Sequence, residues 1–240
     1  MLSKSKVKKI GVAVDSLFQR VKDYVLGYKT DRKITVGVIP EMYKKAVTTG
    51  GGSPNRRTLN TIEAIVTGYL SAQKEKTKAL IVRDVVSAHS ESERSGTDFH
   101  EALGSKLAET WDKTAADLTR IIDSETQSSK AMGIVEAITQ MAAKNGVDDP
   151  TVYFVTVKDK ARCKDCTRVH LLPDETTPRV WKLSEVGAGF HKRGEDKPYM
   201  SGQHPHCRCA LSYLPSGWGF KSGALHYIGP DHDEFREQRE

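Results

Sequence analysis

Cysteine is scarce in this chain, and its placement is informative. Only four cysteines occur among 240 residues, and all four lie in two short segments, 163–166 and 207–209. So few thiols exclude the small disulfide-rich secreted scaffolds. The chain also lacks any apolar run near the roughly 18 residues of a bilayer-spanning helix, which argues against a membrane partner. Residues 1–9 are lysine-rich and contain no apolar core of a secretory signal, so we expect a reducing environment.

Aromatic residues are few as well, and basic residues are unevenly spread. Aromatics make up 7% of the chain and form no interleaved ladder of the kind that single-strand binders use. Residues 1–90 hold 17 Lys/Arg against 7 Asp/Glu. This basic segment either contacts DNA phosphates or an acidic protein surface, or it is the solvated exterior of helices. The densest candidate contacts are Lys4, Lys6, Lys8, Lys9, Arg56 and Arg57.

Apolar residues recur at spacings of three and four in four segments, which predicts amphipathic helices. These segments are 7–28, 59–85, 99–122 and 131–142. Asp98 resembles an N-cap before the third helix, and Asn145-Gly146 is typical of a helix end. Residues 73–78 are polar all round, so we expect that turn of the second helix to face solvent.

The pattern changes after residue 146. A β-branched and aromatic run at 152–157 predicts a strand that leads into the first cysteine pair, and a Gly/Pro-rich, loop-like stretch separates the two pairs. Residues 50–55, Gly-Gly-Gly-Ser-Pro-Asn, are a linker signal. We therefore predict an α+β protein with three segments: a helical or extended arm at 1–52, a helical region at 53–146 and a small zinc-stabilised α+β domain with a tail at 147–240.

The cysteines have the spacing of metal ligands. Cys163-Lys-Asp-Cys166 places two sulfurs on one side of a tight turn, and Cys207 and Cys209 face the same side of an extended segment. Four soft ligands suit one tetrahedral zinc ion and leave no open position for water, so the predicted site is structural. His204 is the alternate ligand if one sulfur points away. No catalytic residue is assigned, and no small-molecule substrate is expected.

Other interpretations of the cysteines stay open. Two disulfides or unligated thiols are the simplest. The His-x-Glu and Pro-Cys-x-x-Cys signature of zinc deaminases is incomplete, because Arg162 precedes Cys163 and no His-x-Glu stands in the right place. A zinc-dependent nuclease would need a histidine base near the cysteine pairs. The candidate bases are His170, His191, His204 and His206.

The second cysteine cluster also resembles a family signature. His204-Pro-His-Cys207-Arg208-Cys209 is similar to the His-Pro-x-Cys-Arg-Cys motif of the phage Mu protein F family of minor head proteins. The upstream strand, Asp159 and the Cys-x-x-Cys pair fit that family too. Glu125 stands where the family has an Arg-Thr-Glu-like motif, although Asp123-Ser124 replaces Arg-Thr. The resemblance covers about residues 120–212.

The resemblance implies a structural protein rather than an enzyme. Members of the family are minor capsid proteins that assist head assembly or DNA delivery in tailed bacteriophages. The implied partners are the portal or the major capsid protein, and packaged DNA is a further candidate. The implied location is the virion, in the head interior or at the portal vertex, after synthesis in the host cytoplasm. The alternative is a zinc-dependent nuclease or a DNA-binding protein that acts during packaging or ejection.

Overall fold

The computed structural model describes residues 4–29, 34–157, 159, 162–192, 195–204 and 207–240. The chain divides into two compact units. Unit 1 comprises Met1–Pro40 and Asn60–Glu125, and unit 2 comprises Glu41–Leu59 and Thr126–Glu240. The fold is mixed α+β, with long N-terminal helices and a small C-terminal sheet region, as predicted. The predicted segment boundaries, after residues 52 and 146, both fall inside unit 2.

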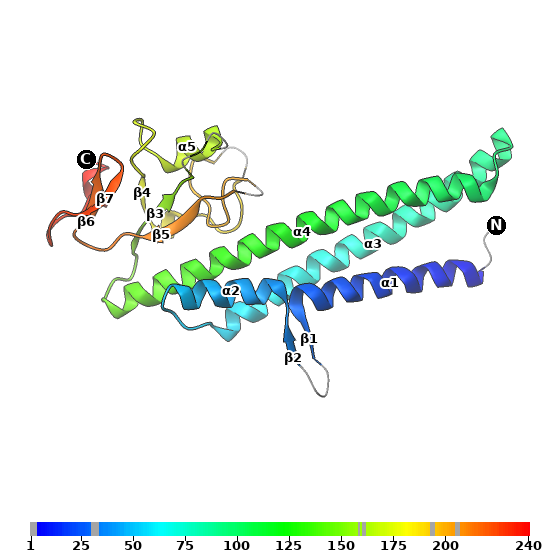
Figure 1. Ribbon diagram of the computed structural model, residues 1–240, viewed down its shortest axis with the longest axis horizontal. Coiled ribbons are helices and arrows are strands. Elements are labelled where there is room, and N and C mark those ends of the chain that lie inside the picture. The colour runs from blue at the N-terminus through cyan, green and yellow to red at the C-terminus, as the bar shows by residue number, and fades with distance from the viewer. Residues whose placement is uncertain (1–3, 30–33, 158, 160–161, 193–194, 205–206) are drawn as a thin grey trace. The chain divides into compact units, whose positions relative to one another are not determined.

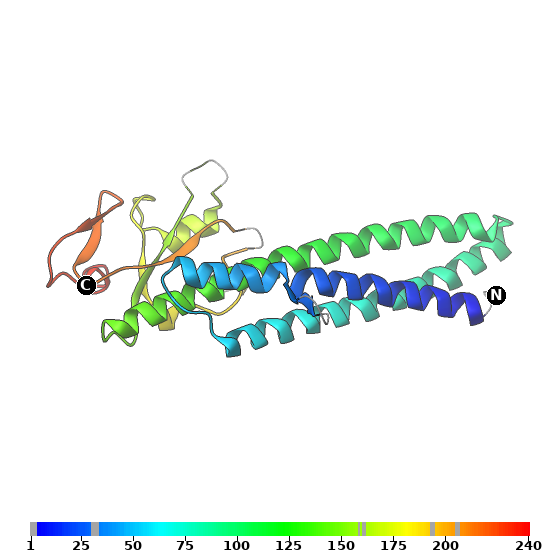
Figure 2. The ribbon, with the colours of Figure 1, turned by 60° about the horizontal axis from the view of Figure 1, so that its bottom comes forward.

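Unit 1 is built from three long helices. They are α1 (Lys4–Leu26), α3 (Arg56–Ser95) and α4 (Phe99–Lys144). Only residues 60–95 of α3 and residues 99–125 of α4 belong to unit 1. The apolar stripes predicted from spacing are buried, and they include Val14, Phe18, Ile62, Val66, Leu70, Ile81 and Leu118. A hairpin of β1 (Gly27–Lys29) and β2 (Ile34–Val36) follows α1. Figures 1 and 2 both show α3 and α4 running side by side as an antiparallel pair.

The connection between α3 and α4 is a tight turn with a cap. Gly96 adopts a left-handed φ of 70°, a conformation that glycine accepts without a Cβ penalty. The Asp98 carboxylate accepts hydrogen bonds from the backbone N–H groups of His100 and Glu101, at 2.9 and 3.1 Å. Two of the free N–H groups at the start of α4 are thereby satisfied. The predicted N-cap at Asp98 is confirmed.

Two expectations about these helices were wrong. The helices predicted at 99–122 and 131–142 are one helix of 46 residues, because the polar stretch between them continues α4 without a break. The polar turn at 73–78 is also not solvated all round. Gln73 and Thr77 are buried, since they face polar side chains of α4: Gln73 donates to Asp117 at 3.1 Å, and the Thr77 and Thr114 hydroxyls lie 3.3 Å apart.

The glycine-rich stretch at 50–55 packs closely inside unit 2. It follows α2 (Val38–Thr49), which Figure 2 shows beside the C-terminal part of α4. A Cβ at Gly50 would lie 2.5 Å from the Cβ of Ala137, and one at Gly133 would lie 2.5 Å from the carbonyl oxygen of Tyr43. The amide of Gln140 also holds both backbone groups of Ser53, each at 2.8 Å. These glycines permit close helix packing where the sequence had suggested a linker.

The sheet of unit 2 has three antiparallel strands in the order β4-β3-β5 (Figure 1). β3 (Thr151–Val155) confirms the predicted strand and pairs with both β4 (Val180–Lys182) and β5 (Ala210–Tyr213). Val152, Phe154 and Leu211 form a core with Ile138 of α4. α5 (Lys164–His170) includes Cys166, and a 3-10 turn at Leu183–Glu185 follows β4. α5 follows β3 in the chain, and its His170 stacks on Phe154 of β3.

The C-terminal residues form a hairpin of β6 (Trp218–Lys221) and β7 (Ala224–Tyr227), followed by α6 (Glu234–Glu237). Charged chain termini such as residues 231–240 often fray. Instead, the Gln238 side chain accepts from the Val180 N–H and donates to the Pro178 carbonyl, both at 3.1 Å. Arg239 pairs with Glu185 at 3.0 Å. Over the part of the chain that is described, no helix is both long and apolar enough to cross a bilayer.

Candidate metal centre

The first cysteine pair sits at the start of α5. Cys163 is the N-cap, and its sulfur accepts a hydrogen bond from the backbone N–H of Cys166 at 3.2 Å. This bond folds the Cys-x-x-Cys segment into a turn and places both sulfurs near the N-terminal end of the helix, as the spacing predicted. The positive end of the short helix and the N–H donor both favour sulfur as thiolate.

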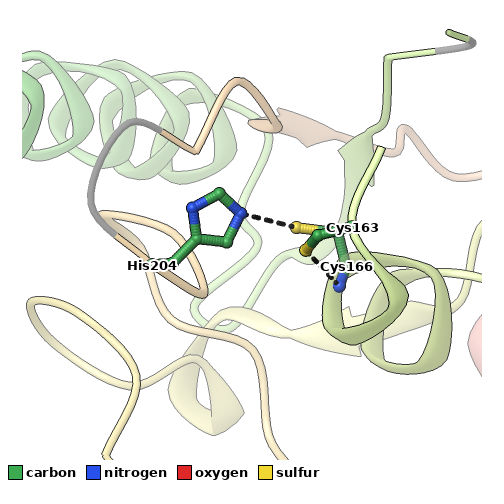
Figure 3. Close-up of side chains that lie close together, drawn as sticks. All are labelled: Cys163, Cys166 and His204. Atoms are coloured by element: carbon green, nitrogen blue, oxygen red, sulfur yellow. Dashed lines mark hydrogen bonds between the residues drawn. The ribbon is translucent and has the colours of Figure 1, made fainter. Parts of the chain in front are cut away.

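The second cluster meets the first at Cys166. The Sγ atoms of Cys166 and Cys207 lie 3.5 Å apart, and Nε2 of His204 lies 3.8 Å from the Cys166 sulfur. Figure 3 shows the His204 ring directed toward the Cys163–Cys166 turn. All four cysteines are free thiols, and a Cys166–Cys207 separation of 3.5 Å is far longer than the roughly 2.05 Å of a disulfide bond.

Two overlapping sets of ligand atoms share the Cys166 sulfur. The ligand atoms of Cys163, Cys166 and His204 lie within 4.8 Å of one another, and so do those of Cys166, His170 and Cys209. Cys207 lies beside the same sulfur. The cluster can therefore hold a metal ion. The structure brings all five predicted residues together around Cys166, and it adds His170, which was considered only as a candidate base.

The pKa values of two neighbouring thiols, Cys166 and Cys207, shift in opposite directions. Hydrogen bonds with Cys207 and Cys209, together with burial, raise the pKa of Cys166. Cys207 shifts in the opposite direction, since hydrogen bonds with Cys166 and Cys209 lower its pKa and outweigh burial. The mutual hydrogen bonds therefore favour the thiolate form of Cys207 over that of Cys166. A divalent cation binds such a set by displacing the remaining thiol protons.

His170 lies beneath the cysteines and is completely buried, with 0% of its surface exposed. Its ring stacks on Phe154 with the centroids 4.1 Å apart and the planes 18° from parallel. Burial lowers the pKa of His170 to about 4, so the imidazole is neutral at neutral pH. The sequence did contain a signal for this residue. His170 follows Cys166 by four positions in α5, so the two side chains lie on one helix face.

Two residues that the sequence did not single out shape the Cys207 loop. The Gln127 amide of α4 donates to the carbonyl oxygens of Ser201 and Cys207, at 2.7 and 2.8 Å. Gly202 has a φ of 107°, and a Cβ there would lie 2.5 Å from the Cβ of Cys207. A close approach to the cysteine therefore requires glycine at this position. Neither residue carries a recognisable motif in the sequence.

An ion pair connects the segment before the first cysteine pair to the second cysteine pair. The Arg208 guanidinium forms a two-pronged contact with the Asp159 carboxylate, at 2.7 and 2.9 Å. Asp159 precedes the first cysteine pair, and Arg208 lies between the two cysteines of the second. Both side chains are about half exposed, so the pair contributes little free energy but fixes the register of the two segments. Asp159 and Arg208, two of the positions on which the predicted family resemblance rests, thus contact each other.

Among the described residues, the ligand sets around Cys166 do not include the remaining predicted site residues. The His191 ring contacts the Glu195 carbonyl oxygen at 2.7 Å, and His206 lies outside the described residues. Arg56 and Arg57 are exposed at the start of α3 in unit 2. Lys4, Lys6, Lys8 and Lys9 belong to α1, and the structure describes only their backbone.

Comparisons of the chain with protein-family models, with curated proteins and with solved structures find no match. The resemblance to the phage Mu protein F family therefore remains a prediction that rests on the motif around His204, Cys207 and Cys209.

Proposed function

We propose that unit 2 contains a structural zinc site and that the protein is a minor capsid component of a tailed bacteriophage, associated with the portal or the inner capsid. The observation that carries the zinc site is the position of the Cys166 sulfur, which has Cys207 at 3.5 Å and His204 at 3.8 Å. Sulfur and imidazole ligands at such separations fit a tetrahedral zinc ion better than they fit magnesium or calcium, which prefer oxygen.

A structural role accounts for the ligand count. Six potential ligands surround the position, more than the four that a tetrahedral ion takes, so protein atoms can fill every coordination position. Cys166, Cys207 and His170 are buried, and a histidine with no exposed surface is poorly placed to act as a base on a nucleic acid. These features support a closed site over a zinc-dependent nuclease.

The site also explains how the C-terminal chain is held together. The first cysteine pair follows β3, and the second immediately precedes β5, which pairs with β3. The ion would close the long excursion between these neighbouring strands. Structural zinc contributes roughly 10–16 kcal/mol in small peptide sites, which is ample to order a segment with little regular structure.

The capsid assignment draws on the motif and on the helices. The His-Pro-x-Cys-Arg-Cys segment is the part that resembles minor head proteins, and Arg208 within it contacts Asp159, another position of the resemblance. The long helices of unit 1 offer an extended surface for a portal or capsid subunit. Nothing in this role requires a catalytic group or a small-molecule substrate.

Metal analysis and virion analysis test the two parts separately. Protein purified without added chelator should contain zinc, and Cys207→Ser should reduce the bound zinc and the protease resistance of residues 158–212. Mass spectrometry of mature virions and of proheads should detect the chain in few copies. A metal-free, fully folded protein would overturn the zinc site, and absence from both particles would overturn the capsid role.

A further inference from the structure

We propose that His170 is a ligand of the metal centre and supplies a nitrogen donor beside Cys166 and Cys209. This inference rests on the proposed zinc site and changes its composition. The predicted set contained four sulfurs, with His204 as the alternate. Here the nitrogen comes from α5, from the residue one helical turn after Cys166.

The first argument is the position of the ring. The ligand atoms of Cys166, His170 and Cys209 lie within 4.8 Å of one another. Zinc bonds of about 2.3 Å to sulfur and about 2.0 Å to nitrogen place tetrahedral ligands roughly 3.5–3.8 Å apart. One ion can therefore bind all three residues after small side-chain adjustments. Because Cys166 and His170 are four residues apart in a helix, the backbone already aims both at the same point.

The second argument is the lack of a hydrogen-bond partner for the ring nitrogens within the described part of the chain. Among the described residues, neither Nδ1 nor Nε2 of His170 finds a hydrogen-bond partner. Buried polar groups are almost always hydrogen-bonded, and leaving one unsatisfied costs about 1–3 kcal/mol. The ring is fully buried against Phe154, so bulk water does not reach it. A metal ion would give a ring nitrogen the partner that the described residues do not provide.

A core histidine without a metal role is the competing explanation, and it predicts a different response to mutation. If His170 only fills space, then His170→Leu removes an unsatisfied polar ring and keeps an apolar side chain of similar size. That change would leave metal binding intact and would stabilise the protein or leave its stability unchanged. If His170 binds the metal, the same change removes a ligand while the metal-free protein keeps its packing.

The test is cobalt substitution of the full-length protein, with His226→Leu as the matched control because His226 is exposed on β7. We expect Co²⁺-loaded wild type to show thiolate charge-transfer and ligand-field bands. His170→Leu should shift the ligand-field bands and weaken Zn²⁺ affinity at least about 100-fold, given that lost outer-sphere partners alone cost 10–100-fold. His226→Leu should match wild type in both.

Two outcomes separate this inference from the zinc site itself. If wild type binds Co²⁺ and His170→Leu has the same spectrum and affinity, His170 is not a ligand, although the zinc site stands. If wild type binds neither Zn²⁺ nor Co²⁺, both proposals fail.

X-ray absorption covers the case in which His170→Leu does not fold. The zinc of the His204→Ala variant should retain a nitrogen in its first shell, supplied by His170. A shell of sulfur alone in that variant would overturn the inference.

Discussion

The two units bury polar side chains in opposite ways. In unit 1, a polar seam runs between α3 and α4 and consists of Gln73, Thr77 and Asp84 on α3 and Thr110, Thr114 and Asp117 on α4. Asp84, Thr110, Thr77 and Thr114 are all nearly inaccessible. Each finds a partner in the seam: Thr110 donates to Asp84, and the two other threonine hydroxyls contact each other. In unit 2, the cysteine cluster converges on one point, and His170 has no hydrogen-bond partner among the described residues.

The difference indicates what each unit needs in order to fold. A seam whose groups satisfy one another is complete in itself, and polar pairs at buried helix positions can fix the register of two helices. A convergent set of thiols and imidazoles is incomplete, because neighbouring thiolates repel and an unpaired ring is unfavourable when buried. Unit 1 should therefore be stable without an ion, whereas unit 2 should depend on one.

The largest effect that tests this contrast is expected from Cys166→Ser, because the Cys166 sulfur is shared by both sets of ligand atoms. The variant should lose bound zinc, and residues 158–212 should become sensitive to protease. The loss approaches the roughly 10 kcal/mol that a structural zinc contributes. Limited proteolysis should show new cleavage in the C-terminal region, and circular dichroism at 222 nm should show that the signal of the long helices is preserved.

Treatment of wild type with a chelator is the matched control, since it removes the ion and leaves the sequence unchanged. It should reproduce the Cys166→Ser pattern. If instead the helices of unit 1 melt together with unit 2, the two units do not differ as proposed.

An intermediate effect is expected within the seam. Asp84→Ala removes the acceptor of the buried Thr110 hydroxyl and a partner of Arg83. An orphaned buried donor costs about 1–3 kcal/mol, so the midpoint of chemical unfolding should fall while the zinc content stays constant. Asp112→Ala, which removes an exposed carboxylate of α4, is the control and should change stability little. Equal stability of the two variants would mean that the seam contributes no net stability.

A smaller effect is expected from Gly202→Ala, which tests how tightly the loop is fitted around Cys207. The new methyl would lie 2.5 Å from the Cys207 Cβ and 3.0 Å from its sulfur, at a φ of 107°. Strained backbone of this kind costs about 1–3 kcal/mol, and the displaced sulfur should weaken zinc affinity. Gly189→Ala isolates the contact, because Gly189 also has a positive φ, 73°, but has open space around its Cα. Weakened zinc binding in both variants would assign the effect to backbone strain alone.

The contrast between the units also explains what the sequence could predict. The helices were predictable because an apolar stripe at spacings of three and four is a local pattern, and α1 and α3 confirm it. The continuity of α4 was not predictable, because the polar residues 123–130 look like a break between two helices when their surroundings are unknown. The burial of Gln73 and Thr77 was unpredictable for the same reason. A polar residue buried against a matching one has the sequence pattern of a solvated residue.

The residues of the candidate metal centre were also only partly predictable from the sequence. The spacing of the cysteines predicted which residues converge, since ligand pairs two and three positions apart are local features. His170 is also local to Cys166, but a histidine in a helix has many possible roles. Only its burial and its unpaired nitrogens distinguish it. Gln127 depends on contacts across 74 and 80 positions of sequence, which no single-sequence pattern records.

The smallest expected effect concerns a third polar cluster, in the tail, which is complete within the chain but depends on a proton. Nε2 of His232 lies 2.8 Å from Glu234, and Nδ1 lies 2.7 Å from Glu237. Burial alone would lower the pKa of His232, but the hydrogen bond with Glu234 and the charge of Glu237 outweigh it and raise the pKa. A raised pKa means that the folded state binds the proton more tightly than the unfolded state. The contribution to stability is therefore complete below about pH 6.5, the ordinary value for histidine, and is lost as pH rises through the higher folded pKa.

We expect hydrogen exchange of residues 231–240 to accelerate over that rise in wild type relative to His232→Gln, in which the side chain does not titrate. The metal centre is present in both proteins, so its own pH dependence cancels in the comparison. Parallel profiles for the two proteins would show that this cluster, like the seam of unit 1, holds without the proton.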